Sequence, residues 1–260
     1  MIVSAPSFQR PTSLFATLLL VLLLSSFSGC KDDDGSASEC KPTSTSINII
    51  MPLGASRVEG DRPEFESFRY ELWKQLVDGG WDFDYIGSRT DLASYPDYAG
   101  LSFDPDHEGR GGWTSGQILD GLNEWLENVG TPDIVLFSSP GGNDMLNGSP
   151  AYSEVISNIN AIIDLLQAAN PNVTILLERL APGKSNFMTS SLTNAFQNMQ
   201  ADLVTIAAQQ TNADSEVIAI DMYTGFNDSF LADDVHYNTA GAKFIADRYY
   251  PVLETILRTE

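Results

Sequence analysis

Short apolar segments alternate along this chain with longer segments of helical period, and this alternation constrains the fold more than any other feature. The apolar segments, which are rich in Val, Ile and Leu, are Ser46–Pro52, Trp81–Ile86, Asp133–Phe137, Val173–Leu177 and Glu216–Asp221. Continuous apolar runs of this length are typical of strands that are buried on both faces. They therefore predict five strands inside a layered domain.

The segments between these strands carry apolar residues at the spacing of an amphipathic helix. They are Pro63–Asp78, Ser115–Val129, Tyr152–Ala169, Leu192–Gln209 and Thr239–Arg258. Strands that alternate with helices favour a parallel sheet covered on both faces. We therefore expect a three-layer, flavodoxin-like α/β fold with a five-stranded parallel sheet, whose ligand sites lie beyond the carboxyl ends of the strands.

Residues 1–29 differ from the rest of the chain. Arg10 is their one charged residue, and Leu14–Leu24 form an apolar run that is too short for a comfortable membrane span and suits a secretory signal. The run leads to Phe27-Ser28-Gly29-Cys30, which resembles a bacterial lipobox. Residues 1–29 are therefore predicted to be a lipoprotein signal peptide, with Cys30 lipidated as the new N-terminus. Cleavage of an ordinary secreted protein nearby is the alternative.

Residues 30–45 are expected to be a linker between the lipid anchor and a domain at 46–260. The segment Lys31-Asp32-Asp33-Asp34 resembles the surface-export signal of Bacteroidetes-type lipoproteins, and Gly35–Thr45 has the Ser, Thr, Lys and Pro content of a flexible linker. This N-terminus predicts export and lipid anchoring to the bacterial outer membrane, and it leaves open whether the domain is exposed on the cell surface. The anchor is the one membrane contact that we expect.

The formal net charge of −21 narrows the classes of partner. Proteins that bind nucleic acid or anionic headgroups neutralise phosphate with excess Lys and Arg, so this chain is expected to bind neither. Neutral substrates such as glycans and simple esters fit the charge, which also favours solubility. The two cysteines are Cys30 and Cys40, and lipidation of Cys30 would leave Cys40 without a disulfide partner. No Cys/His cluster in the sequence suggests a zinc site.

His236 is one of only two histidines, and Asp233 stands three residues before it. At that spacing a carboxylate can accept a hydrogen bond from the imidazole Nδ1–H, which fixes the tautomer and leaves Nε2 free to take a proton from a nucleophile. The pair predicts a general base, with Asp234 as a second candidate for the orienting carboxylate. The other histidine, His107, lies on a predicted loop.

Three further polar segments follow the predicted strands. Ser56 comes after the first strand, Gly112 lies in the glycine-rich segment after the second, and Asn143 follows the third. Taken singly, each is a residue of the kind found in turns and helix caps. Because the carboxyl ends of parallel strands share one edge of a sheet, their order, together with the Asp-x-x-His pair after the fifth strand, favours a single site.

With these motifs in this order, the chain from Ile47 onward resembles an SGNH (GDSL-type) hydrolase. The resemblance implies that Ser56 is the nucleophile and that Asp233 and His236 complete the catalytic set. It also implies that the backbone amides of Ser56 and Gly112 and the side-chain amide of Asn143 form the oxyanion hole.

Two details refine the resemblance. The segments Met51-Pro52-Leu53-Gly54 and Asp106-His107-Glu108-Gly109, the latter followed by Gly-Trp-Thr, are most like carbohydrate acetylesterases of the third esterase family. In that family the histidine segment shapes the loop, and His107 and Trp113 are candidates for substrate contact. The first block of the family usually reads Gly-Asp-Ser, whereas here Ala55 replaces the aspartate. This change affects contacts in the local turn and not the expected chemistry.

The resemblance implies a serine esterase that hydrolyses carboxylic esters, above all acetyl esters of carbohydrates, by acyl transfer through a covalent intermediate. It implies no metal and no organic cofactor. A lysophospholipase or thioesterase of the same fold is the nearest alternative enzyme. A surface glycan-binding lipoprotein on a disabled scaffold is the alternative outside catalysis, and Ala55 is the feature in its favour.

Overall fold

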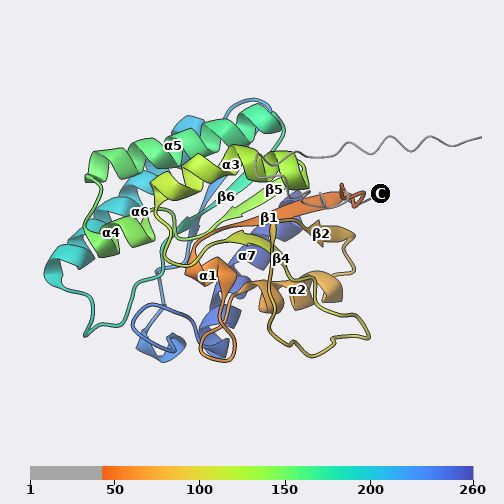
Figure 1. Ribbon diagram of the computed structural model, residues 1–260, viewed down its shortest axis with the longest axis horizontal. Coiled ribbons are helices and arrows are strands. Elements are labelled where there is room, and N and C mark those ends of the chain that lie inside the picture. The colour runs from red at the N-terminus through yellow and green to blue at the C-terminus, as the bar shows by residue number, and fades with distance from the viewer. Residues whose placement is uncertain (1–42, 260) are drawn as a thin grey trace, which may run out of the picture. The chain divides into compact units, whose positions relative to one another are not determined.

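A mostly parallel sheet runs through residues 43–259, the part of the chain that the computed structural model describes (Figure 1). Its seven strands are β1 (Asn48–Gly54), β2 (Phe83–Tyr85), β3 (Arg89–Thr90), β4 (Asp106–Gly109), β5 (Ile134–Phe137), β6 (Thr174–Arg179) and β7 (Val217–Asp221). They lie in the order β3-β4-β1-β5-β6-β7, and β2 also pairs with β1. Every pair is parallel except β3 with β4.

The predicted α/β fold and its parallel strands are confirmed, but the strand count differs. The five predicted strands are β1, β2, β5, β6 and β7, and the structure adds β3 and β4. The segment with His107, which the sequence predicts as a loop, is strand β4, so that prediction is wrong. The sequence gives no sign of β4 because it is a short polar strand, buried through its contacts with β1, β3 and the short helix α1 (Ser56–Glu59).

The long helices follow the predicted periodicity, with one large boundary difference. They are α2 (Arg69–Asp78), α3 (Ser115–Val129), α5 (Tyr152–Ala169), α6 (Ser190–Gln210) and α7 (Thr239–Ile256), which contains Pro251. Helix α2 begins at Arg69 and not at Pro63. The residues between them fold back as a turn, in which the Ser67 hydroxyl donates to the carbonyl of Val58 (2.8 Å).

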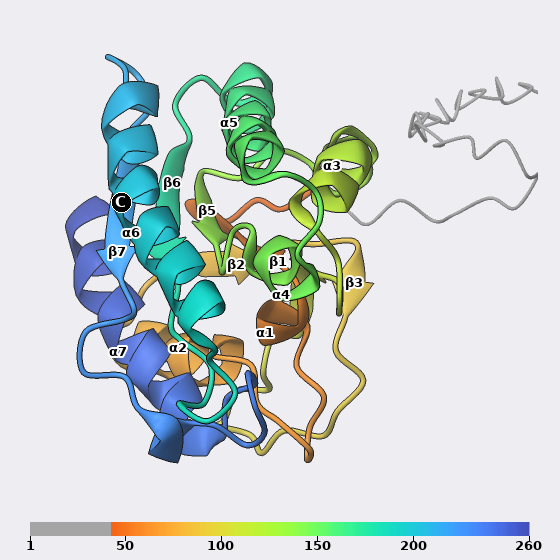
Figure 2. The same ribbon diagram turned by 90° about the vertical axis from the view of Figure 1, so that its left-hand side faces the viewer.

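Helices cover both faces of the sheet: α3, α5 and α6 lie on one face, and α2 and α7 lie on the other (Figures 1 and 2). The side chains of β5 alternate between these two layers. Val135 and Phe137 pack with α3, α5 and α6, whereas Ile134 and Leu136 pack with α2 and α7. All four side chains are buried, so one strand contributes to both hydrophobic cores.

Three short helical elements follow strand ends at one edge of the sheet. Helix α1 follows β1, helix α4 (Gly142–Asn147) follows β5, and the 3₁₀ helix η1 (Asp228–Phe230) follows β7. The fold predicts a ligand site at this edge. Within residues 43–259, no helix is long and apolar enough to span a membrane. The predicted signal peptide, Cys30, Cys40 and most of the predicted linker lie outside the described residues.

Candidate active site

The end of β1 and the loop before α7 bring Ser56, His236 and Asp233 into one hydrogen-bonded chain. Ser56 Oγ lies 2.8 Å from Nε2 of His236, and Nδ1 of the same ring lies 2.7 Å from Oδ2 of Asp233. Ser56 is the first residue of α1, directly beyond β1, so its side chain is held at the edge of the sheet. In this geometry Nδ1 donates to the carboxylate while Nε2 accepts from the serine hydroxyl.

Asp233, and not Asp234, is the carboxylate that lies beside the His236 ring. Its Oδ1 also accepts the backbone N–H groups of Val235 (2.9 Å) and His236 (2.7 Å), so the loop turns around it. Partial burial raises the pKa of Asp233, but the hydrogen bonds from His236 and the two amides outweigh burial and lower the pKa to about 2. Asp233 is therefore ionised at neutral pH. Asp234 instead accepts the amide of Lys184 with its backbone carbonyl (2.8 Å).

Phe65 covers one face of the His236 ring. The two ring centroids lie 3.9 Å apart and the ring planes meet at 15°. The stack limits rotation of the imidazole and shields one of its faces from water. Phe65 falls within the predicted helix Pro63–Asp78. That interpretation misses the contact, because the residue belongs instead to the turn between α1 and α2.

The glycine-rich segment after β4 lies directly against α1. A Cβ at Gly109 would lie 2.4 Å from the backbone nitrogen of Glu59, so only glycine allows this approach. Glu59 Oε2 accepts the N–H of Gly111 (2.7 Å), and Gly112, at φ +78°, lines a cleft together with Ser56. The sequence analysis missed Glu59, although its position three residues after Ser56 is the spacing of neighbours on one helix face.

Asn143 reaches the same cleft from α4. One N–H of its side-chain amide donates to the carbonyl of Trp113 (2.8 Å), which leaves the second N–H for a ligand. The next residue, Asp144, is buried and accepts both the backbone N–H and the hydroxyl of Ser115 (2.8 Å each), which ties α4 to the start of α3. The Trp113 ring packs against Trp125, with centroids 5.7 Å apart, so substrate contact by Trp113 stays a prediction.

His107, on β4, lines the cleft, but its side chain is almost fully buried. It is 2% exposed, and its Nδ1 accepts the N–H of Gly109 (2.9 Å). Spacing alone does not separate the two histidines, because Asp104 also stands three residues before His107. The carboxylate of Asp104, however, accepts the amides of Tyr85 (2.8 Å) and Asp106 (3.2 Å). An Nδ1 that accepts an N–H cannot donate to a carboxylate. His107 therefore lacks the hydrogen bond from Nδ1 to an aspartate that His236 makes. Its contact with substrate stays a prediction.

Arg57, the second residue of α1, joins the loops around the site. Its buried guanidinium donates from Nε to the carbonyl of Val235 (2.9 Å) and from Nη1 to the carbonyl of Ala181 (2.8 Å). The guanidinium carbon also lies 4.8 Å from the centroid of the Tyr237 ring. Val235 and Tyr237 flank the histidine, so this one side chain connects the helix that carries the serine with the loop that carries the histidine.

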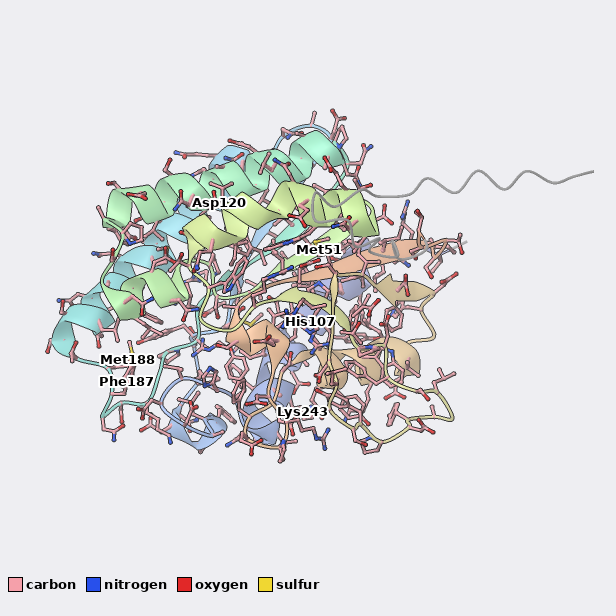
Figure 3. The ribbon with its side chains drawn as sticks, viewed as in Figure 1. Met51, His107, Asp120, Phe187, Met188 and Lys243 are labelled. Atoms are coloured by element: carbon pink, nitrogen blue, oxygen red, sulfur yellow. The ribbon has the colours of Figure 1, made fainter. Side chains whose placement is uncertain are left out.

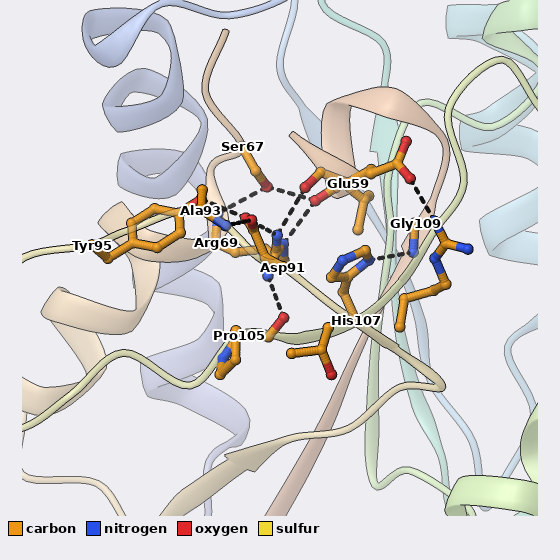
Figure 4. Close-up of polar contacts among 12 residues, drawn as sticks. Glu59, Ser67, Arg69, Asp91, Ala93, Tyr95, Pro105, His107 and Gly109 are labelled. Atoms are coloured by element: carbon orange, nitrogen blue, oxygen red, sulfur yellow. Dashed lines mark hydrogen bonds and ion pairs between the residues drawn. The ribbon is translucent and has the colours of Figure 1, made fainter. Parts of the chain in front are cut away.

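Arg69, the first residue of α2, holds the other end of α1 (Figure 4). Its fully buried guanidinium donates to the carbonyls of Val58 (2.7 Å) and Glu59 (2.9 Å), at the end of α1. It also pairs with Asp91 (2.9 Å), whose carboxylate accepts the hydroxyl of Tyr95 (2.6 Å). The loop that carries Asp91 lines the cleft, so Arg69 fixes that loop relative to α1.

A fully buried carboxylate, that of Glu178 on β6, lies close to Arg57. Its Oε2 accepts the N–H of Ser139 (2.8 Å), and its Oε1 accepts the hydroxyl of Tyr237 (3.4 Å). Burial raises the pKa of Glu178, and the positive charge of Arg57 and the Ser139 amide act in the opposite direction. The carboxylate therefore links the segment after β5 to the segment before α7.

A cleft of about 840 Å³ opens beside Ser56, His107, Asn143 and His236. Figure 3 shows His107 near the centre of the view, beside α1. The charged residues that line it are Glu59, Asp61, Arg62, Arg89 and Asp91. Several of these charges are compensated, since Arg89 lies 3.1 Å from Glu59 and Asp91 pairs with Arg69. Such a cleft favours a neutral, polar ligand. Within residues 43–259, no group of three or more His, Cys, Asp or Glu is arranged to hold a metal ion.

A comparison with known protein families matches residues 77–244 to the GDSL-like Lipase/Acylhydrolase family. The match spans more than half of the chain. The chain belongs to this family. The matched range begins after Ser56 and includes Gly112, Asn143, Asp233 and His236.

Solved structures agree with the family match. A carbohydrate esterase family 3 protein from Talaromyces cellulolyticus is 30% identical, with a TM-score of 0.69, over 80% of this chain and 97% of that chain. A mutant acetyl esterase solved with an acetate ion is 29% identical, with a TM-score of 0.69 and the same coverage. A family 3 carbohydrate esterase from Clostridium thermocellum is 28% identical, with a TM-score of 0.64, over 81% of this chain and 99% of that chain. Among curated proteins, none matches the chain.

This GDSL-like acylhydrolase is therefore a carboxylic ester hydrolase. The family, the α/β fold and ester hydrolysis, each predicted from the sequence, are confirmed. The residues that the sequence analysis missed are Arg57, Glu59, Phe65, Arg69 and Glu178, which support Ser56 and His236 through tertiary contacts.

Proposed function

We propose that this acylhydrolase is a serine esterase that removes acetyl groups from carbohydrates. The observation that carries the proposal is the hydrogen-bonded chain from Ser56 through His236 to Asp233, with distances of 2.8 and 2.7 Å. The three related structures named above are carbohydrate or acetyl esterases, which favours an acetylated carbohydrate as the substrate. The wide cleft beside Ser56, which is lined by several charged residues, gives room for a sugar.

The mechanism uses the two ring nitrogens of His236. Nε2 takes the proton of Ser56 as Oγ attacks the ester carbonyl, while the ionised Asp233 stabilises the imidazolium through Nδ1–H. The bond between the carbonyl carbon and the alcohol oxygen then breaks, and Nε2 gives its proton to that oxygen, which leaves an acetylated serine. Water activated by Nε2 attacks this acyl-enzyme, releases acetate and restores the serine.

N–H groups from three segments support an oxyanion hole. Ser56 is in the first turn of α1, where helix amides have no partner within the helix. Gly112 and the second side-chain N–H of Asn143 belong to the lining of the same cleft. One such donor contributes about 3–4 kcal/mol to transition-state stabilisation, so Asn143→Ala is expected to lower kcat by about 10²–10³-fold.

The proposal is tested by comparing Ser56→Ala with Ser102→Ala, a variant of an exposed serine outside the cleft lining. Turnover of p-nitrophenyl acetate and acetate release from acetylated xylan are measured for both. Ser56→Ala should lose about 10⁴-fold or more in kcat, because the covalent route is removed, whereas Ser102→Ala should keep the wild-type rate.

A near-full rate in Ser56→Ala would reject the serine mechanism. Turnover of p-nitrophenyl acetate without acetate release from any acetylated glycan would reject the carbohydrate substrate and keep the esterase.

We also propose that Cys30 carries a lipid that anchors the exported enzyme to the outer membrane. The apolar run Leu14–Leu24 and the small residues before Cys30 support this proposal. Metabolic labelling of the full chain with a palmitate analogue in a bacterial host tests it. Cys30→Ala should lose the label and the membrane association, whereas Cys40→Ala should keep both. Label that persists in Cys30→Ala would contradict the proposal.

A further inference from the structure

A second, much smaller pocket borders Ser56. Its lining is mainly apolar and includes Leu146, Leu180 and Phe196, while Ser56 and Asn143 line both this pocket and the cleft. The pocket has a volume of about 40 Å³. One water-sized group needs about 10–15 Å³, so the pocket holds roughly three such groups. That space matches an acetyl group and is too small for a longer acyl chain.

An apolar groove of about 560 Å³ adjoins the pocket at Leu146. It runs between the first turns of α5 and α6, and its lining includes Tyr152, Leu192 and Phe187, which is 36% exposed. Figure 3 shows Phe187 and its neighbour Met188 at the edge of the molecule. Leu146 lines both the pocket and the groove, and none of the other described residues does. Its side chain therefore separates the two spaces.

We propose that Leu146 is the wall that restricts the acyl group of the substrate to acetyl, an inference that rests on the proposed esterase function at Ser56. Leu146 stands three residues after Asn143 in α4, which is the spacing of neighbours on one helix face. With the alcohol part of the ester in the wide cleft, the acyl group enters the small apolar pocket, and a longer chain meets Leu146. Without this side chain the pocket opens into the groove.

Leu146 can be shortened with little effect on the fold. Its side chain is partly exposed, whereas the other apolar walls, Leu180 and Phe196, are 0% and 4% exposed and belong to the hydrophobic core. Helix α4 is held by the hydrogen bonds from Ser115 to Asp144, which do not involve Leu146. Leu146→Ala is therefore expected to widen the pocket without moving α4.

The test measures kcat/KM for p-nitrophenyl acetate, butyrate and hexanoate. The variants are Leu146→Ala, Leu146→Val as a milder change, and Leu192→Ala as a matched control that lines the groove but not the pocket. The wild type should prefer acetate. Leu146→Ala should raise the butyrate-to-acetate ratio by about tenfold or more, since one methylene in an apolar pocket changes discrimination by about 10–200-fold. Leu146→Val should raise the ratio less, and Leu192→Ala should keep the wild-type ratio.

If the Leu146 variants still hydrolyse p-nitrophenyl acetate but keep the wild-type butyrate-to-acetate ratio, the proposed role of Leu146 is overturned. The proposed esterase function would then remain. The same conclusion follows if wild-type enzyme hydrolyses hexanoate as fast as acetate, or if Leu192→Ala shifts the ratio as much as Leu146→Ala. Failure of the proposed function has a different signature, namely acetate turnover that survives in Ser56→Ala.

Discussion

Replacing Arg57 with methionine tests how strongly the fold depends on the contact between the serine helix and the histidine loop. Arg57 is 8% exposed and donates to the carbonyls of Val235 (2.9 Å) and Ala181 (2.8 Å). A hydrogen bond from a charged group contributes about 1.5–3 kcal/mol, so the loss of both should lower the free energy of unfolding by about 3–6 kcal/mol. Methionine keeps an unbranched side chain and removes the donors and the charge.

The effect on catalysis is expected to exceed the effect of lost stability. Val235 and Tyr237 flank His236, so their release lets the imidazole move relative to Ser56 Oγ, which lies 2.8 Å from Nε2. A misplacement of about 1 Å can lower a rate by about 10²-fold. We expect kcat for p-nitrophenyl acetate to fall by about 10- to 100-fold.

Arg248→Met is the matched control. Arg248 also donates to a backbone carbonyl, that of Asp221 (2.9 Å), and lies 4.8 Å from the centroid of the Phe244 ring, but its contacts are on α7 and at the end of β7. Urea unfolding followed by circular dichroism gives the stability of both variants. Initial rates are then measured at a temperature at which both are folded. A kcat for Arg57→Met equal to that for Arg248→Met would refute the reasoning.

The contributions of two carboxylates, Asp233 and Glu178, to the stability of the fold should change with pH in opposite directions. The pKa of Asp233 is lowered from 3.8 to about 2, so its stabilising effect is present above its usual pKa and is lost as pH falls toward 2. Asp233→Asn should lack this acid-dependent loss in unfolding experiments, and its kcat at neutral pH should fall by about 10⁴-fold. Burial raises the pKa of Glu178, so wild-type stability is lost as pH rises through that raised value. The unfolding free energy of Glu178→Gln relative to wild type should therefore increase as pH rises above 4.5, the usual pKa of the carboxyl, and a constant difference would contradict this account.

The parts of the fold that depend on apolar pattern could be predicted from the sequence, and the parts that depend on tertiary contacts could not. Strand β5 is a continuous apolar segment, Ile134–Phe137, and both of its faces are buried as that pattern predicts. Strand β4, Asp106–Gly109, has no apolar run, and its burial arises from contacts with β1 and α1. Helix α2 begins six residues after its predicted start at Pro63, because the intervening residues form a turn against α1.

The same distinction applies to the residues of the site: some could be located from the sequence, and others are recognised only by their tertiary contacts. Ser56, Asn143 and His236 could be located because each follows a strand in a parallel sheet, and such strands end at one edge. The supporting contacts join segments that are distant in sequence. Arg57 donates to the carbonyl of Val235, which is 178 residues further along the chain, and Phe65 stacks on a ring from the loop before α7. No spacing within a segment encodes such a pair.

Ala55 departs from the usual Gly-Asp-Ser motif of the family, but this departure does not separate Ser56 from His236. It is the N-cap of α1 and provides no side-chain cap for the helix. The helix is fixed instead by two arginines, since Arg57 ties it to the loops after β6 and before α7, and Arg69 binds the carbonyls at its C-terminal end. Ser56 Oγ accordingly lies within hydrogen-bonding distance of His236. The feature that favoured a disabled scaffold in the sequence therefore leaves the contact between Ser56 and His236 in place.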